Sequence, residues 1–170
     1  MIKNDFVPFE RKNNENKDLL FLGNKKILEK YKTAFLCSKK CPSDIVIKSL
    51  DWAIEKKNNG ECVISGFHSR IEKDVFNILI KGKQPIILVL ARGMKKRWPV
   101  EIKKAIKEER LLVISPFENN VKNITQKTAN RRNELMAKIA DEIFIAYYTP
   151  NGNIHNLIEI LKNKKISSFY

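Results

Sequence analysis

Short apolar runs recur along the chain, and they restrict its fold more than any other feature of the sequence. Each run is about four to seven residues long, and segments with helical periodicity separate the runs. The runs occupy residues 33–37, 62–65, 85–90, 111–115 and 142–148. Strands that are almost continuously apolar are buried on both faces, as in a parallel sheet that helices cover on both sides. The pattern therefore predicts an α/β fold with an open parallel sheet and helices on both faces.

The segments between the runs carry the signals with which helices begin and end. Ser43 is placed to cap a helix that runs to about Lys57, and Pro99 stands where the first residue of a later helix would lie. We predict helices over residues 43–57, 70–81, 100–109, 128–140 and 154–161.

The 170 residues are enough for a single domain. Residues 1–18 are polar and rich in Asn, and we expect a weakly ordered N-terminal arm there, followed by one domain over residues 19–170. The sequence has neither an apolar stretch of membrane-spanning length nor the apolar core of a signal peptide, so we expect a cytoplasmic protein with no membrane partner. The three cysteines have no metal-ligand spacing, and we expect reduced thiols.

The chain is strongly basic. Lys and Arg number 33 against 19 Asp and Glu, which gives a formal net charge of +14. A coding bias toward Lys and Asn is one explanation, but it would supply Glu as well. The excess favours a polyanionic partner, either a nucleic acid or a phosphorylated ligand.

The loops that follow the predicted strands are the places to look for a binding site, because open parallel sheets bind ligands at the carboxyl ends of their strands. The stretch from Ser65 to Arg70, which also contains Gly66, His68 and Ser69, fits an anion cradle of backbone N–H groups, hydroxyls and a guanidinium. It fits equally a plain strand-to-helix turn that Ser69 caps.

Two further segments carry basic residues. Arg92 to Lys104 holds the densest group of cations, with Trp98 among them, and this combination suits phosphate neutralisation with base stacking on a single strand. The alternative is an exposed loop whose tryptophan turns inward. Arg132 and Asn133 suit a phosphate or base contact, or simply the exposed first turn of a helix.

No complete set of catalytic residues is present. The glycine-rich nucleotide motifs are missing, no group of residues has metal-ligand spacing, and His68 lacks the partners of a triad, although Cys37 lies after another strand and could approach it. We therefore expect no metal, no cofactor and no catalysis.

Taken in order, the loop motifs resemble those of the DNA-processing protein A (DprA/Smf) family, a branch of the SLOG superfamily with a Rossmann-like domain. The similarity runs from about residue 20 to residue 153. It rests on Leu20–Asn24, Cys37–Lys39, Val63–Glu72, Ala91–Gly93, Leu111–Ser115, Arg132–Glu134 and Gly152–Asn153. The chain departs from the family pattern at Cys37 and Arg70, where the family has Gly, and at Glu134, where it has Arg. The Pro-Gly-Gly-x-Gly-Thr motif of the sister phosphoribohydrolase branch is absent.

The resemblance implies a Rossmann-like domain that binds single-stranded DNA, forms a homodimer and serves DNA uptake, recombination or processing, with a recombinase as a possible partner. A different class stays open: a sensor or hydrolase of a nucleotide-derived small molecule, which would use the same loops as a closed pocket over Gly66 and Gly152. The predicted nucleic-acid or phosphate-binding residues are Ser38, Lys39, Ser65, Gly66, His68, Ser69, Arg70, Arg92, Lys95, Lys96, Arg97, Arg132, Asn133 and Gly152.

Overall fold

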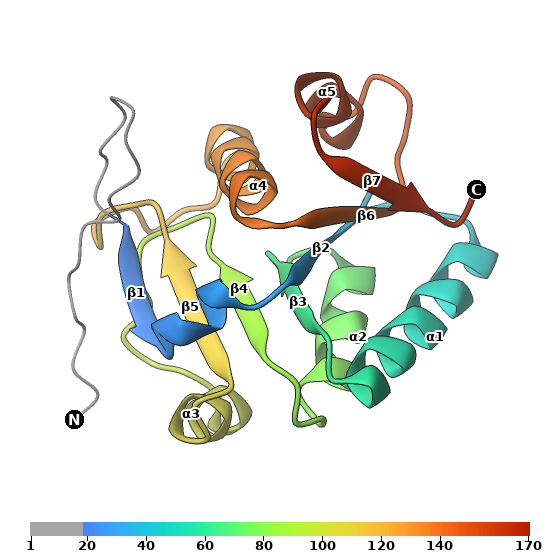
Figure 1. Cartoon of the computed structure of the whole chain (residues 1–170). Coiled ribbons are helices and arrows are strands. Elements are labelled where there is room, and N and C mark those ends of the chain that lie inside the picture. Colours follow the sequence, from blue (N-terminus) through green and yellow to red (C-terminus); the bar gives the residue numbers. More distant parts are fainter. Residues whose placement is uncertain (1–18) are drawn as a thin grey trace.

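A computed structural model of the chain describes residues 19–170, which form one seven-stranded sheet with helices on both faces (Figure 1). The strands are β1 (Leu20–Gly23), β2 (Lys32–Cys37), β3 (Cys62–Ser65), β4 (Ile86–Val89), β5 (Leu111–Ser115), β6 (Glu142–Tyr147) and β7 (Lys165–Ser168). Their order across the sheet is β1-β5-β4-β3-β2-β6-β7, and every pair is parallel except β1 with β5. The predicted arm at 1–18 lies outside the described residues, and a single domain over 19–170 stays a prediction.

The helices divide between the two faces of the sheet, as Figure 1 shows. The lower face in that view carries α1 (Ser43–Asn59), α2 (Arg70–Leu79) and α3 (Val100–Lys107), whereas the upper face carries α4 (Gln126–Ile139) and α5 (Asn153–Ile160). The short 3-10 helix η1 (Lys25–Glu29) joins the α4 side through Ile27. The predicted α/β fold with an open, mostly parallel sheet and helices on both faces is confirmed.

Strand β2 illustrates why the apolar runs had to be central strands. All six of its residues are buried. Phe35 faces the α1 side, where its ring lies 4.9 Å from that of Trp52 and 6.2 Å from that of Phe144, and Leu36 faces the α4 side. Successive side chains point to opposite faces of a strand, so a strand covered on both sides must be apolar at every position.

Neither edge strand, β1 or β7, was among the five predicted strands, and β1 is the one that runs antiparallel to its neighbour. Strand β1 runs antiparallel, so its last residue lies at the end of the sheet where β2 and the other strands begin. Residues 24–31 are enough to connect β1 with β2. A parallel β1 would finish at the carboxyl end of the strands and would need a crossover of about a dozen residues or more to reach the start of β2. At the other edge, β7 was not predicted, because Lys-Ile-Ser-Ser has no apolar run and its pairing with β6 is a tertiary contact.

Helix starts lie close to the sequence signals, but two of them are shifted by one residue. Ser69 caps α2 and Thr125 caps α4 through their side chains. Ser43 was expected to cap α1, but it is the first helical residue, and Pro42 occupies the cap position without a side-chain hydrogen bond. Pro99 likewise stands one position earlier than predicted, at the cap of α3.

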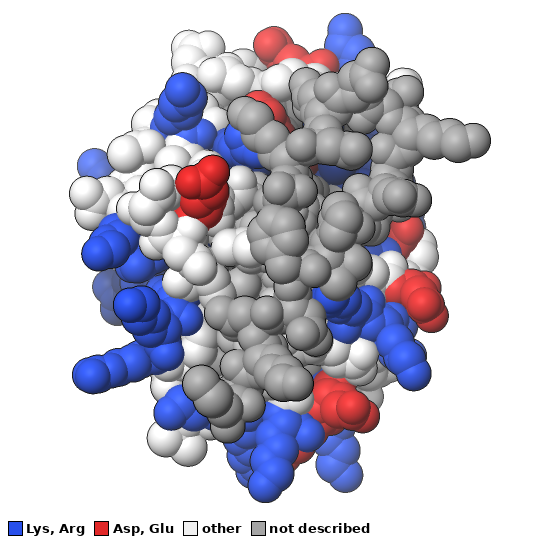
Figure 2. All heavy atoms as spheres, turned by 90° about the vertical axis from the view of Figure 1, so that its left-hand side faces the viewer, with Lys and Arg blue, Asp and Glu red and all other residues white. Residues whose placement is uncertain are grey.

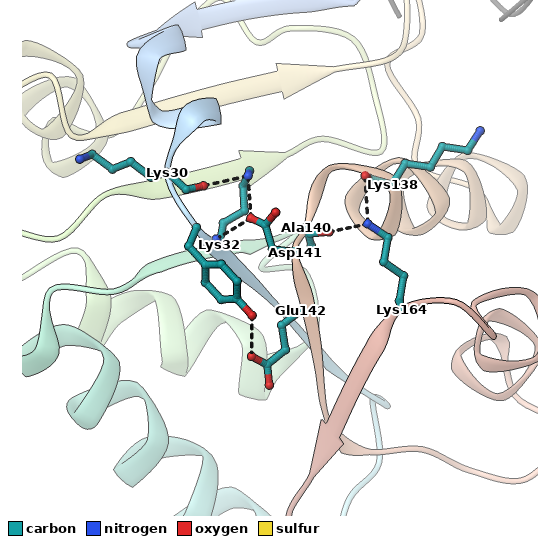
Figure 3. Close-up of polar contacts among 8 residues, drawn as sticks. Lys30, Lys32, Lys138, Ala140, Asp141, Glu142 and Lys164 are labelled. Atoms are coloured by element: carbon teal, nitrogen blue, oxygen red, sulfur yellow. Dashed lines mark hydrogen bonds and ion pairs between the residues drawn. The ribbon is translucent and has the colours of Figure 1, made fainter.

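Lysines at the amino ends of the strands are held by acidic and carbonyl oxygens (Figure 3). The ammonium of Lys32 lies 2.9 Å from Asp141 Oδ2 and donates to the carbonyl of Lys30, while Lys164 donates to the carbonyl of Ala140 at the end of α4. The ammonium groups of Lys32 and Lys164 are therefore satisfied within the protein. None of the helices within residues 19–170 is both long and apolar enough to cross a membrane.

Candidate nucleic-acid interface

The strand order reverses between β2 and β6, and the loops after these two strands are hydrogen-bonded to each other. The backbone N–H of Ser38 donates to the carbonyl of Tyr147 at 2.9 Å, and the Ser38 hydroxyl accepts from the N–H of Thr149 at 3.2 Å. Gly152 caps α5, and a Cβ there would lie 2.7 Å from Thr149 Oγ1. Ser38 and Gly152 thus build the switch point of the sheet, the usual place for a ligand in such folds. Beside them, Lys39 is exposed.

The turn from β3 into α2 satisfies its own polar groups. The Ser65 hydroxyl is fully buried, donates to the carbonyl of Phe35 and accepts from the N–H of Phe67. The Ser69 hydroxyl accepts from the N–H of Glu72, so both serines support the turn.

The predicted cradle of backbone N–H groups at this turn is wrong. The buried carboxylate of Glu72 accepts hydrogen bonds from the N–H groups of His68 and Ser69 at 2.9 and 3.1 Å. These donors would otherwise be free at the start of the helix and attract an external anion. Because an internal anion already occupies these two donors, they are not available to a ligand, whereas the exposed side chain of Arg70 at the first position of α2 is available.

Gly66 leaves room for a buried guanidinium. A Cβ on Gly66 would lie 2.6 Å from the guanidinium carbon of Arg132, so no other residue fits without moving that side chain. Arg132 comes from α4, is 7% exposed, and donates from Nε and Nη2 to Oδ1 of Asn133 at 3.1 and 3.0 Å. The close approach that the glycine permits is therefore to a cation of the protein itself. Arg132 and Asn133 are largely buried at the carboxyl end of β3, and the predicted exposed first turn is wrong.

Electrostatic effects on His68 and Lys95 show which cations lie near one another. Burial lowers the pKa of His68, and the positive charges of Arg132, Lys73 and Lys39 lower it further. Burial also lowers the pKa of Lys95, and Arg92 and Lys73 add to that effect. Lys73, in the first turn of α2, therefore lies close enough to lower the pKa of both His68 in the loop after β3 and Lys95 in the loop after β4. Sequence reasoning missed Lys73, although its position one turn after the Ser69 cap placed it at this edge.

The loop after β4 splits into a buried and an exposed part. Lys95, Lys96 and Arg97 are exposed, whereas Trp98 is 8% exposed and belongs to the core beside α3, with the Lys95 ammonium 5.6 Å from its ring. Base stacking on Trp98 is therefore ruled out in this structure, and the alternative that the tryptophan turns inward is correct.

Arg92 is held in place by a second loop. The hydroxyl of Ser115 donates to the carbonyl of Arg92, and the N–H of Gly93 donates to the carbonyl of Val121 at 2.7 Å. Nε of Arg92 is buried and has no hydrogen-bond partner within residues 19–170. A buried donor without a partner is costly, so this guanidinium is suited to a ligand that accepts a hydrogen bond.

We define the strand-end rim as the basic side chains that follow β2, β3 and β4. Its members are Lys39, His68, Arg70, Lys73, Arg92, Lys95, Lys96 and Arg97. Within residues 19–170 no ion pair includes any of them, whereas acids at the other end of the strands pair with Lys32, Lys56, Arg110 and Lys165. The lysine and arginine members of the rim are therefore a row of positive charges that no ion pair within residues 19–170 neutralises, whereas the lowered pKa of His68 favours its neutral form.

Basic side chains are not confined to this rim. Figure 2 shows the face that carries β1 and α3, where Lys and Arg outweigh Asp and Glu and gather toward the lower end of the view. The exposed lysines of α3, Lys103, Lys104 and Lys107, belong to this part of the surface. The net charge alone does not locate a binding site, so a test needs a control at lysines away from the rim.

The two buried cysteines, Cys37 and Cys62, are poorly suited to act as nucleophiles. Cys37, Cys41 and Cys62 are all free thiols. Burial raises the pKa of Cys37, and it raises the pKa of Cys62 to about 12, so both are protonated at neutral pH. A protonated thiol is a poor nucleophile. The described residues contain no group of His, Cys, Asp and Glu side chains that could hold a metal ion.

An open, mostly parallel α/β sheet with helices on both faces places the protein in the Rossmann-like class of folds. Residues 9–154 match the family model of DNA recombination-mediator protein A, and the chain belongs to that family. A search of curated proteins by sequence found no match.

Solved structures with the same fold include two called DNA processing protein A. DNA processing protein A from Helicobacter pylori, whose structure was reported for its single-stranded DNA binding mode, superposes with a TM-score of 0.77 at 15% identity, over 98% of this chain and 80% of its own. The Streptococcus pneumoniae protein gives 0.73 at 17% identity over 96% of this chain, which spans only 62% of that longer protein. The molybdenum cofactor carrier protein of Chlamydomonas reinhardtii gives 0.52 at 7% identity, over 82% of this chain and 76% of its own. At these identities the likeness shows the fold alone.

Proposed function

We propose that this chain binds single-stranded DNA without catalysing a reaction on it, and that the strand-end rim is the contact surface. The observation that carries the proposal is the row of lysine and arginine side chains beyond the carboxyl ends of β2, β3 and β4, none of which forms an ion pair within residues 19–170. Membership in the DNA recombination-mediator protein A family supports DNA as the polyanion, and so does the single-stranded DNA binding mode reported for the Helicobacter pylori protein.

The arrangement suits an extended ligand. Neighbouring strands lie about 4.8 Å apart, so the rim from β2 to β4 extends over about 10 Å. That distance corresponds to about three nucleotides at the 3.4 Å spacing of one strand of a duplex. Lysine and arginine side chains that neutralise successive phosphates release bound counterions, which gives affinity without dependence on base sequence.

The rival function, a sensor or hydrolase of a nucleotide-derived small molecule, needs a closed pocket over Gly66 and Gly152. The space that each glycine leaves is filled by the protein itself, by Arg132 in one case and by Thr149 in the other. Two hollows of about 1000 and 410 Å³ lie instead near the amino ends of the strands, beside α2 and the turn before β4, and neither is lined by Gly66 or Gly152. These features support the extended ligand.

Further parts of the proposal rest on the family alone. We infer a cytoplasmic protein that acts in DNA uptake, recombination or processing, forms a homodimer and delivers the strand to a recombinase. Sedimentation of the purified chain, alone and with a bacterial recombinase, tests the last two points.

The decisive experiment is a binding titration with labelled single-stranded and duplex DNA at two salt concentrations, using a charge-reversed rim. The variant Lys95→Glu, Lys96→Glu, Arg97→Glu changes only exposed residues, so it should fold like the parent. We expect it to bind single-stranded DNA at least about ten-fold more weakly. We also expect a flatter log–log salt dependence, because each lost phosphate contact removes about 0.7 from the slope.

The matched control reverses the same number of charges near the amino ends of the strands. Lys81, Lys83 and Lys107 are also exposed, and their reversal to Glu alters the net charge equally. This control should keep most of the parent's affinity and its salt slope. Equal losses in the two variants would mean that net charge alone drives binding. A folded rim variant that binds like the parent would contradict the proposed contact surface.

A further inference from the structure

Tyr148 is the one exposed aromatic side chain at the carboxyl edge of the described sheet. Three aromatic residues within 19–170 are largely exposed: Tyr31 at 61%, Tyr148 at 42% and Tyr170 at 80%. Tyr31 directly precedes β2 at the amino edge, and the hydroxyl of Tyr170 donates to Asp44 beside α1. Tyr148 directly follows β6, next to the loop that carries Lys39.

The ring of Tyr148 is supported from one side. It stacks on the ring of His155 in α5, with centroids 5.6 Å apart and an interplanar angle of 23°. Nδ1 of His155 accepts a hydrogen bond from the N–H of Asn151 at 2.8 Å, which fixes the orientation of the imidazole. The backing ring is therefore held in place before any ligand arrives, and the exposed part of the tyrosine is available for a second flat group.

The backbone on either side of Tyr148 is also anchored. The carbonyl of Tyr147 accepts from the N–H of Ser38, the N–H of Thr149 donates to the Ser38 hydroxyl, and the carbonyl of Thr149 accepts from the N–H of Gly152. These bonds fix the loop against β2 at the switch point of the sheet. A rigid aromatic group binds a flat partner with little loss of conformational entropy.

We propose that Tyr148, backed by His155, is a stacking platform for a nucleobase of the bound strand, and this proposal rests on the single-stranded DNA binding proposed above. The exposed Lys39, which follows Ser38, lies where it can neutralise a neighbouring phosphate. A base stacks on an aromatic ring through its π face, which every base has, so the platform accepts any base and leaves sequence preference weak.

The test compares an intact strand with one that has no bases. Binding is measured for labelled oligo-dT and for an abasic deoxyribose-phosphate strand of equal length, with the parent and with Tyr148→Ala, Tyr148→Leu, Tyr148→Phe and Tyr31→Ala. We expect Tyr148→Ala and Tyr148→Leu to lose about 5- to 100-fold in affinity for oligo-dT, the usual range for one stacked base. Tyr148→Phe keeps the ring and should stay within about two-fold, as should the control Tyr31→Ala.

Two signatures separate stacking from charge. Because tyrosine is neutral, the log–log salt slope of Tyr148→Ala on oligo-dT should equal that of the parent. On the abasic strand, Tyr148→Ala should bind as the parent does. An equal loss on both strands, or no loss on oligo-dT, would overturn the platform while DNA binding itself stands. A parent that binds neither strand would overturn the proposed function and the platform together.

Discussion

Replacement of Gly66 by alanine tests whether this glycine exists for the sake of the Arg132 guanidinium. Gly66 does not have a positive φ angle, so alanine introduces no backbone strain. The new Cβ would lie 2.6 Å from the guanidinium carbon and from Nε and Nη1 of Arg132. Carbon atoms in good contact lie about 3.5–4.0 Å apart, so the guanidinium must move by about 1 Å.

That displacement has a cost that can be estimated from the bonds it breaks. Nε and Nη2 of Arg132 share one acceptor, Oδ1 of Asn133, and a shift of about 1 Å removes both bonds from hydrogen-bonding range. A hydrogen bond to a charged group contributes about 1.5–3 kcal/mol. We expect Gly66→Ala to lower the free energy of unfolding by an amount in that range, because the buried guanidinium finds only partial replacement in water. The fold should survive, since only the end of a flexible side chain has to move.

A double-mutant cycle in urea denaturation isolates the contact. In an Arg132→Ala background the clash no longer exists, so Gly66→Ala should not destabilise the protein and should instead raise the free energy of unfolding by about 0.4–1 kcal/mol, because alanine restricts the unfolded chain more than glycine does. If Gly66→Ala costs the same in both backgrounds, Arg132 is not the reason for the glycine, and the assignment of this contact is refuted.

Two further predictions concern stability. Asp141→Asn removes the ion-pair partner of the buried Lys32 and should lower the free energy of unfolding by about 1–2 kcal/mol, less than for a fully buried pair because Asp141 is partly exposed. Its hydrogen bonds with Lys32 hold the pKa of Asp141 below its usual value against the opposing effect of burial, so this contribution is present above about pH 4 and is lost as the pH falls through the lowered pKa; urea midpoints at pH 7 and pH 3 should differ less in the variant than in the parent. Ser69→Ala removes the hydroxyl that accepts from the N–H of Glu72 and should cost about 1 kcal/mol, and an unchanged melting temperature would contradict the role of this cap.

Much of the fold was encoded locally. The apolar runs predicted the five central strands because a strand covered on both faces has to be apolar at every position, as β2 shows. The Ser69 cap followed from a hydroxyl directly before an amphipathic segment. Such signals act over a few residues, so they can be recognised without knowing where the rest of the chain lies.

The contacts of the candidate site were decided by the tertiary structure. The sequence placed Gly66 and Arg132 on separate segments, and only the packing of α4 beside β3 brought the guanidinium onto the glycine. Glu72 is a different case, because its contacts are local. It lies three residues after the Ser69 cap, and its carboxylate accepts from the N–H groups of His68 and Ser69, which were expected from the sequence to bind an anion.

Two aromatic side chains show most clearly which features the sequence predicts and which depend on the tertiary structure. Trp98 and Tyr148 both follow a strand, and composition suggested Trp98 as the surface that stacks on a base. The position of α3 buries Trp98, whereas the switch from β2 to β6 leaves Tyr148 exposed on a loop that Ser38 holds. The sequence by itself determined which segments are strands and helices and that the chain is basic, because hydrophobic periodicity and charge are properties of neighbouring residues. Which side chains face the solvent at the carboxyl edge depends on how those segments cross over one another, and that follows only from the packing of the whole sheet.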